Sequence, residues 1–524
     1  MKRFIFSVLI ILSAYQLGNA EQTDVETKRE LFKREREYSS SNYFLHFNRI
    51  TSATHLWEGP MWSEMELTIN QYDNPFKTPY MFRNGNSIEF STESVQKIDS
   101  LGYAFYGKFS YKTNRDFDSD YNQFYKMPDY GNPIFLFVPV KGNWETQEYY
   151  FKGGISKEIV KRRLYVGASM SYNGNLFNRI IDTRNRQTDL SIHLSPSITY
   201  NLSNKNSLSL AFNYNRAKYE PLNSHYSQRP GDDSNYWLYL NKGLGTYERL
   251  NTGYGFYSII NNFDISTQWH KKYRQNNLFT ATFSFENGSN IFQSKVNIPE
   301  TNDFFKLGKY DWQNIGGQIS ISNKLFSKRA LSSLSFKNIK GKAFTYNIQQ
   351  SQYQNSYKYT GRSLSAMSKI FVDRSILNFC SLAFHINYVN AIDMNYGHRY
   401  SYTNIIPVLL ANLFSVNFLK GEISSQITAS GNYNYSFIHQ PLSAISNIYT
   451  TGIAYPSLSY YTSNYFVLNP SIFWEKIVNN RVLFGLELGA SVLKPLSINY
   501  INSYTTIGTD DMNKSLYLTL RVVF

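Results

Sequence analysis

The last eleven residues of this 524-residue chain, 514–524, alternate between two kinds of side chain. Successive side chains of a β-strand point to opposite faces, so an extended segment here would present one apolar face and one mostly polar face. The apolar face would consist of Leu516, Leu518, Leu520, Val522 and Phe524. Because the strand ends on an aromatic residue, we expect its apolar face to meet lipid and not a soluble core.

The first twenty residues predict a secretory signal peptide. Lys2 and Arg3 are basic, residues 4–15 are apolar, and residues 18–20 are small enough for a cleavage site. We therefore expect cleavage between Ala20 and Glu21. The single cysteine, Cys380, cannot form an intramolecular disulfide, so stability must come from packing and the backbone ladder.

Composition favours a membrane barrel over a helical membrane protein. Aromatic residues make up 17% of the chain, with 44 Tyr and 38 Phe, while the mean hydropathy is −0.41. A membrane helix needs about 20 consecutive apolar residues, and none follows the signal peptide. Strands hide their lipid-facing half within alternation and concentrate aromatics at the interfaces. The net charge of +15 is not gathered on a recognition helix, and an exported chain rarely meets nucleic acid, so no nucleic-acid partner is expected.

Alternation recurs along the chain. Residues 190–202 and 208–214 form one predicted hairpin around a polar turn at 203–206, and residues 466–474 and 482–492 form another. About eighteen segments have the ~9–11 residues that a tilted strand needs to cross lipid. Their connections alternate short and long, as expected for periplasmic turns and outer loops. The segments near 311, 357 and 403 alternate least clearly, so a barrel of about 14 or 16 strands is also compatible.

Two prolines interrupt these strands. Pro196 and Pro470 occupy the matching contexts Leu-Ser-Pro-Ser-Ile and Leu-Asn-Pro-Ser-Ile. Proline removes a ladder hydrogen bond and is normally confined to edges or bulges. We expect a bulge in the periplasmic rim at each position.

The predicted domains are a signal peptide at 1–20, an N-terminal segment at 21–60 and the barrel at 61–524. Residues 21–37 are densely charged, and residues 42–57 mix aromatic with polar side chains without clean alternation. This segment is expected either to lie in the periplasm or to plug the lumen.

Catalytic and metal chemistry find little support. A nucleophile needs a base within hydrogen-bond reach, and two histidines share a predicted inward face with serines. These residues are His193 with Ser191 and Ser195, and His385 with Ser381. Serine neighbours arise readily in a polar lumen, and neither a Gly-x-Ser-x-Gly nor a His-Glu-x-x-His motif is present. We expect no enzyme activity, no cofactor and no metal.

Charged turns and loops suggest contacts with partners. Basic residues gather at the predicted periplasmic turns, where they are either solvated or dock an acidic partner: Lys157, Lys161, Arg162, Arg163, Lys271, Lys272, Arg274, Lys324, Lys328 and Arg329. The outer loop at 179–186 could bind lipopolysaccharide phosphates or fold into the mouth. The apolar loop at 123–142, with Tyr125, Tyr130, Phe135, Phe137 and Val138, could constrict the opening or pack against its neighbours.

The terminal Phe524, the Tyr- and Asn-rich strands and the Lys-containing signal peptide resemble outer-membrane β-barrels of the Bacteroidota, including uncharacterised families found beside TonB-dependent receptors. The resemblance implies an antiparallel up-and-down transmembrane barrel whose closing strand is read by the barrel-assembly machinery. It also implies contact with outer-membrane lipid and lipopolysaccharide, and a TonB-dependent receptor or periplasmic protein as a partner.

We expect a channel or transporter component for small solutes. The alternatives are an accessory barrel that scaffolds a receptor or surface complex, and an outer-membrane hydrolase.

Overall fold

The computed structural model describes most of the chain from Ile50 to Phe524. The described residues are 50–56, 62–121, 123, 131–181, 184–224, 237–244, 247–250, 255–273, 278–295, 304–325, 328–347, 350–371, 379–395, 397–419, 421–440, 450–478, 482–500 and 510–524. The predicted signal peptide, its predicted cleavage site at Ala20 and Glu21, and most of the 21–60 segment lie outside them.

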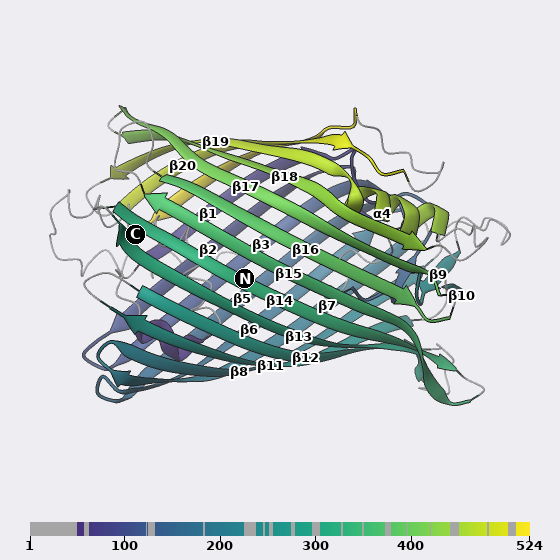
Figure 1. The fold of residues 1–524 in the computed structure, drawn as a ribbon, viewed down its shortest axis with the longest axis horizontal. Coiled ribbons are helices and arrows are strands. Elements are labelled where there is room, and N and C mark those ends of the chain that lie inside the picture. The colour runs from purple at the N-terminus through teal and green to yellow at the C-terminus, as the bar shows by residue number, and fades with distance from the viewer. Residues whose placement is uncertain are drawn as a thin grey trace.

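Eighteen antiparallel strands close into one barrel (Figure 1). This confirms the predicted fold class and the upper end of the predicted strand number. The strands are β1(Trp62–Asp73), β2(Asn84–Ile98), β3(Tyr103–Ser119), β5(Gly142–Val160), β6(Leu164–Arg179), β7(Arg184–Ser203), β8(Asn206–Ser224), β11(Gly255–Lys272), β12(Leu278–Lys295), β13(Phe304–Leu325), β14(Lys328–Asn347), β15(Gln352–Phe371), β16(Phe379–Asp393), β17(Arg399–Phe418), β18(Gly421–Gln440), β19(Asn464–Val478), β20(Val482–Ser497) and β21(Asn513–Val523).

The ladder closes where the first strand meets the last. β21 pairs with β20 on one side and with β1 on the other, where Thr68 lies opposite Thr519. Phe524 extends the seam, since its N–H donates to the Ser63 carbonyl oxygen at 2.8 Å. Arg521 crosses the same seam to the carboxylates of Glu64, at 2.6 Å, and Glu66, at 3.3 Å. Each of the eighteen described barrel strands therefore has two partners, and the barrel sheet has no open edge.

The predicted alternation sorts side chains into an outer apolar face and an inner polar face. On β7, Ile192 and Leu194 are exposed on the outside, whereas Ser195 and Ser197 are buried inside. The outer apolar face recurs around the wall, for example at Leu210, Ile265, Phe283, Ile319, Phe336, Leu364 and Phe384, all exposed. A monomer in water rarely exposes so continuous an apolar surface, whereas lipid accepts it.

Among the described residues, no helix is both long enough and apolar enough to cross a membrane.

Two expectations about the strands, their length and the strict alternation of short and long connections, were wrong. The strands run from 11 to 22 residues, mostly longer than the length needed to cross lipid, because they continue past the apolar band. Both chain ends of the barrel lie at one end, which we call the C-terminal end, and the opposite end is the loop end. All connections at the C-terminal end are short, as predicted. Three at the loop end, 180–183, 348–351 and 394–398, are also short, because the extended strands leave few residues for them.

The prolines do not create bulges. Pro196 pairs in register with Ala168, and Pro470 pairs in register with Ile427. On the opposite sides, the ladders with β8 and β20 skip these positions and resume in the same register. The bulge prediction is wrong because a missing N–H removes one ladder bond without adding a residue to the strand.

Several short elements lie apart from the wall. The 3₁₀ helix η1(Thr51–Leu56) precedes β1, and a three-stranded sheet comprises β4(Phe135–Phe137), β9(Leu238–Asn241) and β10(Tyr247–Leu250). A π-helical turn, η3(Thr450–Ala454), leads into α4(Tyr455–Thr462). Figure 1 places β9, β10 and α4 at the right, the loop end, opposite the chain terminus marked C.

Candidate functional site

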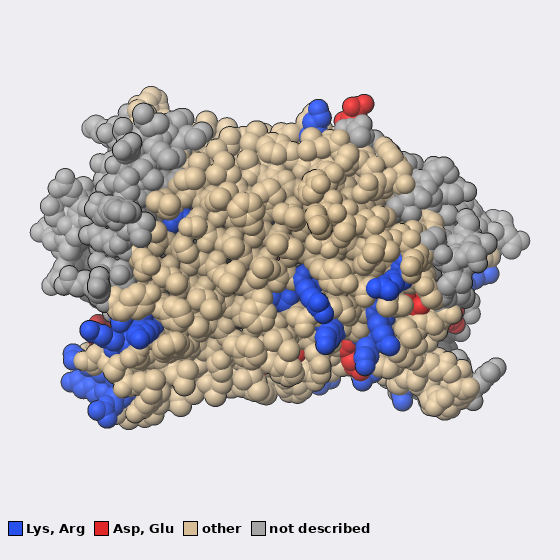
Figure 2. Space-filling model, in the orientation of Figure 1, with Lys and Arg blue, Asp and Glu red and all other residues tan. Residues whose placement is uncertain are grey.

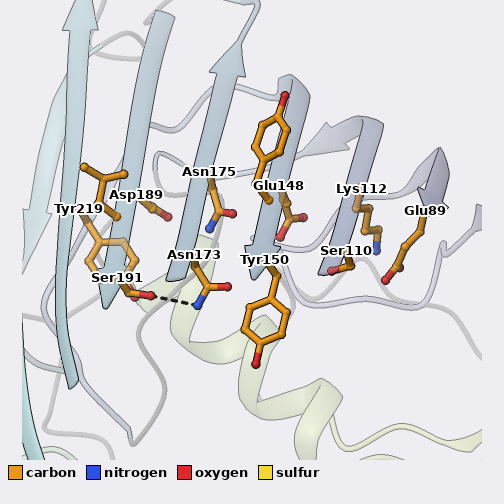
Figure 3. Close-up of a pocket in the computed structure, with 12 residues that line it drawn as sticks. Glu89, Ser110, Lys112, Glu148, Tyr150, Asn173, Asn175, Asp189, Ser191 and Tyr219 are labelled. Carbon is orange, nitrogen blue, oxygen red and sulfur yellow. Dashed lines mark hydrogen bonds between the residues drawn. The ribbon is translucent and has the colours of Figure 1, made fainter. Parts of the chain in front are cut away.

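A row of polar side chains crosses the inner wall on six consecutive strands. Each residue pairs directly with the next, so the row follows from strand register alone: Glu89, Lys112, Glu148, Asn175, Asp189 and Tyr219. We call it the acidic row, because it carries three carboxylates and one ammonium. Figure 3 shows these side chains on their neighbouring strands.

The acidic row borders a cavity of about 290 Å³ in the lumen. The next inward positions toward the C-terminal end supply Ser110, Tyr150, Asn173 and Ser191 to the same cavity. Within it, the Asn173 amide donates to Ser191 Oγ at 3.0 Å (Figure 3). The Gln187 amide, one inward position nearer the loop end, holds Asp189 Oδ1 at 2.7 Å. The cavity thus offers carboxylate, amide, hydroxyl and aromatic groups, a set that suits a small polar solute.

The small sheet of β4, β9 and β10 packs inside the loop end, and we call it the mouth sheet. Phe137 and Tyr239 stack at a centroid distance of 5.2 Å, and Leu136 and Leu240 are almost fully buried. These side chains form one hydrophobic cluster with inward rings of the barrel wall, including Tyr310 and Trp312. The described part of the apolar loop at 123–142 therefore packs against its neighbouring loop and against the inner wall of the loop end. Tyr125 and Tyr130 of this loop lie outside the described residues.

Polar contacts fix the mouth sheet to the wall. The Leu244 N–H donates to Asp393 Oδ2 at 2.7 Å, and the Leu244 carbonyl oxygen accepts from His398 Nδ1 at 2.6 Å. His398 Nε2 lies 2.9 Å from His439 Nε2 on β18. Because the carbonyl can only accept, His398 carries its proton on Nδ1, and His439 donates to Nε2. One backbone position in the connection between β9 and β10 is thus held by two side chains, Asp393 at the end of β16 and His398 in the connection between β16 and β17.

Aromatic side chains from other loop-end segments extend this packing. The Tyr80 hydroxyl, in the connection between β1 and β2, is hydrogen-bonded to the Tyr461 hydroxyl of α4. Burial raises the pKa of Tyr80 and of Tyr461, so both phenols stay neutral. The ring of Phe76 packs against the ring of Tyr460, with 4.8 Å between the ring centroids.

At the other end of the lumen, η1 lies against the inner faces of β5, β6 and β7. The Ser52 N–H donates to Ser197 Oγ at 2.9 Å, and the Ser52 and Thr199 hydroxyls lie 2.8 Å apart. Gly167 makes this approach possible, since a Cβ there would come within 2.7 Å of the Ser52 backbone nitrogen. The cavity lies between η1 and the level of the mouth sheet along the wall.

The candidate catalytic residues do not assemble into a recognisable site. His193 faces the lumen opposite Ser171 and Asn215, while Ser191 and Ser195 lie one inward position away on the same strand. His385 does contact a serine, but it is Ser365 on β15, whose Oγ lies 2.7 Å from His385 Nδ1.

Strand register explains that contact, because Ser365 lies directly opposite His385, whereas Ser381 lies farther along β16. The same register row continues to Ser335 and Ile406 and brings no carboxylate to orient the imidazole. Among the described residues, no group of three or more His, Cys, Asp or Glu side chains is arranged to hold a metal ion.

The charged segments divide between the two ends and the interior. Lys157, Lys161, Arg162, Arg163 and Lys271 are exposed at the C-terminal end. The side chains of Arg274, Lys324, Lys328 and Arg329 lie outside the described residues, and Lys272 is half-buried.

The loop at 179–186 is split. Arg179, the last residue of β6, is buried and donates to the carbonyl oxygens of Val140, at 2.7 Å, and Ile181, at 3.0 Å, whereas Ile180 and Ile181 are exposed. Arg184 and Arg186 remain exposed.

A model described as a family of unknown function, DUF6850, matches residues 51–524. None of the curated proteins compared with the chain matches it.

Solved structures similar to the chain include the alcaligin outer-membrane receptor FauA from Bordetella pertussis, at 9% identity and a TM-score of 0.35, covering 89% of this chain and 76% of that one. The outer-membrane transporter YddB from Escherichia coli is 9% identical with a TM-score of 0.41, covering 88% and 81%. The FrpB iron transporter from Neisseria meningitidis is 10% identical with a TM-score of 0.39, covering 89% and 82%. These are likenesses of fold.

Proposed function

The chain belongs to a family of unknown function, DUF6850, and we propose from its own structure that it is an outer-membrane β-barrel through which small polar solutes pass, without catalysis. The observation that carries the proposal is the polar lumen with its cavity, set between η1 and the mouth sheet. An eighteen-strand closure encloses a lumen wide enough for water, and loops or segments inside it regulate access.

The orientation follows from the connections. Outer-membrane barrels keep short turns on the periplasmic side and longer loops outside. The C-terminal end therefore faces the periplasm, and the loop end, with the mouth sheet, faces outward. In this proposal residues 1–20 are an export signal, residues 21–60, which include η1, are a periplasmic or plug segment, and residues 61–524 form the barrel. The outward residues of β21 act as its assembly signal for the barrel-assembly machinery.

Planar-bilayer recording tests the proposal, because a narrowed mouth predicts small currents that grow when the mouth sheet is loosened. Phe137→Ala combined with Tyr239→Ala removes the stacked pair at its centre. We expect this variant to conduct several-fold more than the unchanged protein. The matched control is Phe283→Ala, which removes an exposed ring from the outer wall and should leave the current unchanged.

Silence of both the parent and the loosened variant across several salt concentrations would rule out a channel. It would leave an accessory barrel as the better description.

A hydrolase is the second candidate, favoured only by the contact between His385 and Ser365. Activity on phospholipid or peptide substrates that His385→Ala abolishes and His193→Ala leaves intact would establish it. Absence of turnover in the parent protein would remove it.

A further inference from the structure

The outer wall carries a group of basic side chains at the loop-end side of its apolar band. On β14, the outward residues Leu334 and Phe336 are apolar and exposed, and beyond them Lys340 and Lys342 are exposed in the same alternation. Figure 2 shows blue side chains gathered over the region of β13–β15, toward the end where Figure 1 labels β9 and β10.

Strand register places cations from neighbouring strands beside these lysines. Lys342 lies directly opposite Lys358 of β15, and Asn338 lies directly opposite Arg362. On its other neighbouring strand, β13, Lys342 lies opposite Asp311. The same row continues from Lys358 through Ile392 of β16 to Arg399 of β17. We call this group the basic patch: Lys309, Lys340, Lys342, Lys358, Arg362 and Arg399.

Carboxylates of the described outer wall do not balance the patch. Asp311 lies within it and pairs with Lys309 at 2.8 Å, so five cations stand beside one neutralised pair. Like charges directly opposite each other on a ladder, as at Lys342 and Lys358, destabilise a sheet. A bound anion would turn that repulsion into attraction.

The position of the patch identifies the chemistry of the anion. A row of outward residues adjoins the patch on the side of the lipid-facing band. It consists of Gly317 and three exposed apolar residues, Phe336, Leu364 and Ile386. Acyl chains packed on that row would bring their headgroups level with the cations. Lysine and arginine bind phosphate through short charge-assisted hydrogen bonds. A soluble anion would use the cations but not the adjoining apolar row.

We propose that the basic patch binds the phosphorylated headgroup of an outer-leaflet lipid whose acyl chains lie against β13–β16. This inference rests on the proposed outer-membrane location and adds the residues that would contact the lipid. It differs from the sequence-based expectation, which placed lipopolysaccharide contacts on the loop at 179–186.

The test uses the full-length barrel in mild detergent micelles with bisphosphorylated lipid A as the probe, measured by native mass spectrometry. The variant is Lys340→Gln, Lys342→Gln and Lys358→Gln together. At a membrane surface each cation contributes enough that the triple change should weaken binding about 10- to 100-fold. The control is Lys157→Gln, Lys161→Gln and Lys271→Gln, which removes equal charge from exposed positions at the C-terminal end.

Two further arms decide between sources of the anion. Dephosphorylated lipid A should bind the parent protein as weakly as lipid A binds the triple variant. Inorganic phosphate at millimolar concentration should fail to displace lipid A. Equal loss in both lysine variants, equal binding of dephosphorylated lipid, or displacement by phosphate would each overturn the proposal.

Failure of this inference is separable from failure of the proposed function. A barrel that inserts into vesicles and conducts, but shows no preference for the phosphorylated lipid, rejects only the patch. A chain that neither inserts nor becomes heat-modifiable rejects the membrane location itself.

Discussion

Single small residues decide what can lie inside this barrel. Most inward positions near η1 are serine, threonine or glycine, so the wall is thin there and a segment can approach its backbone. At Gly167 the space that a side chain would take is occupied by the backbone of Ser52. The hydroxyls of Ser197 and Thr199 then satisfy the polar groups of Ser52, which burial would otherwise leave without a partner.

Gly167→Ala should therefore dislodge η1 without opening the barrel. The added methyl meets backbone atoms at 2.7 and 3.0 Å, so the helix must shift and lose its two hydrogen bonds to β7. The expected cost is about 1–2 kcal/mol, or roughly a 10-fold increase in local opening. Limited proteolysis of the N-terminal segment, followed by intact mass, measures it.

The matched control is Gly107→Ala, since a Cβ there meets nothing within 4 Å. Equal proteolysis of both variants would show that η1 is not held by this contact.

At the scale of elements, the closing strand and the mouth strands are specified differently. β21 carries its own pattern, with Leu516, Leu518, Leu520, Val522 and Phe524 outward and the polar set inward, as predicted. β4 and β9 are three and four residues long and buried on both faces. Such short strands exist only because each pairs with the other and packs on the wall.

Phe524→Ala tests whether β21 is also an assembly signal. Phe524 and Phe484 are both half-buried, so each loses about 1.5–3 kcal/mol of burial at most. Phe484 has the added edge contact with Trp474, at 6.1 Å, and its loss should cost slightly more in the folded barrel. A recognition role reverses that order, and Phe524→Ala should then lower the folded outer-membrane fraction more at matched expression.

An equal or smaller loss for Phe524→Ala would reduce the terminal aromatic to an ordinary lipid-facing residue. The ladder bond between Phe524 and Ser63 uses backbone atoms, so the substitution leaves it in place.

For the whole molecule, closure makes the barrel a single cooperative unit. All eighteen strands are bonded to two neighbours, and the first pairs with the last. In a membrane the backbone polar groups of strands can be satisfied only in such a closed ladder. Opening any one seam exposes unpaired N–H and C=O groups on two strands at once.

The folded protein should accordingly be heat-modifiable. Purified in mild detergent, it should migrate as a compact species on unheated SDS gels and shift to the apparent mass of its unfolded chain after boiling. In cells it should fractionate with the outer membrane. A protein that remains soluble and shows one mobility under both conditions would contradict the membrane barrel.

Local chemistry explains how much of this fold could be predicted. Period-two alternation reports the two faces of a strand wherever lipid lies on one side and a polar lumen on the other. Turn residues report where each strand ends. Even the segments near 311, 357 and 403 proved to be strands β13, β15 and β17. The bulges expected at Pro196 and Pro470 were wrong because a missing donor need not shift the register.

The sequence by itself thus determined the barrel class, the two faces of its strands and a strand number near the eighteen observed, because each depends on neighbours within one strand or hairpin. Only the tertiary structure decided what those faces assemble. The acidic row and the basic patch depend on the stagger between strands, which brings together residues far apart in the sequence. The contact of Leu136 in β4 with Leu240 in β9 depends on two loops meeting over the same aromatic wall. Alternation records which way a side chain points, whereas stagger and loop packing determine which other side chains it meets.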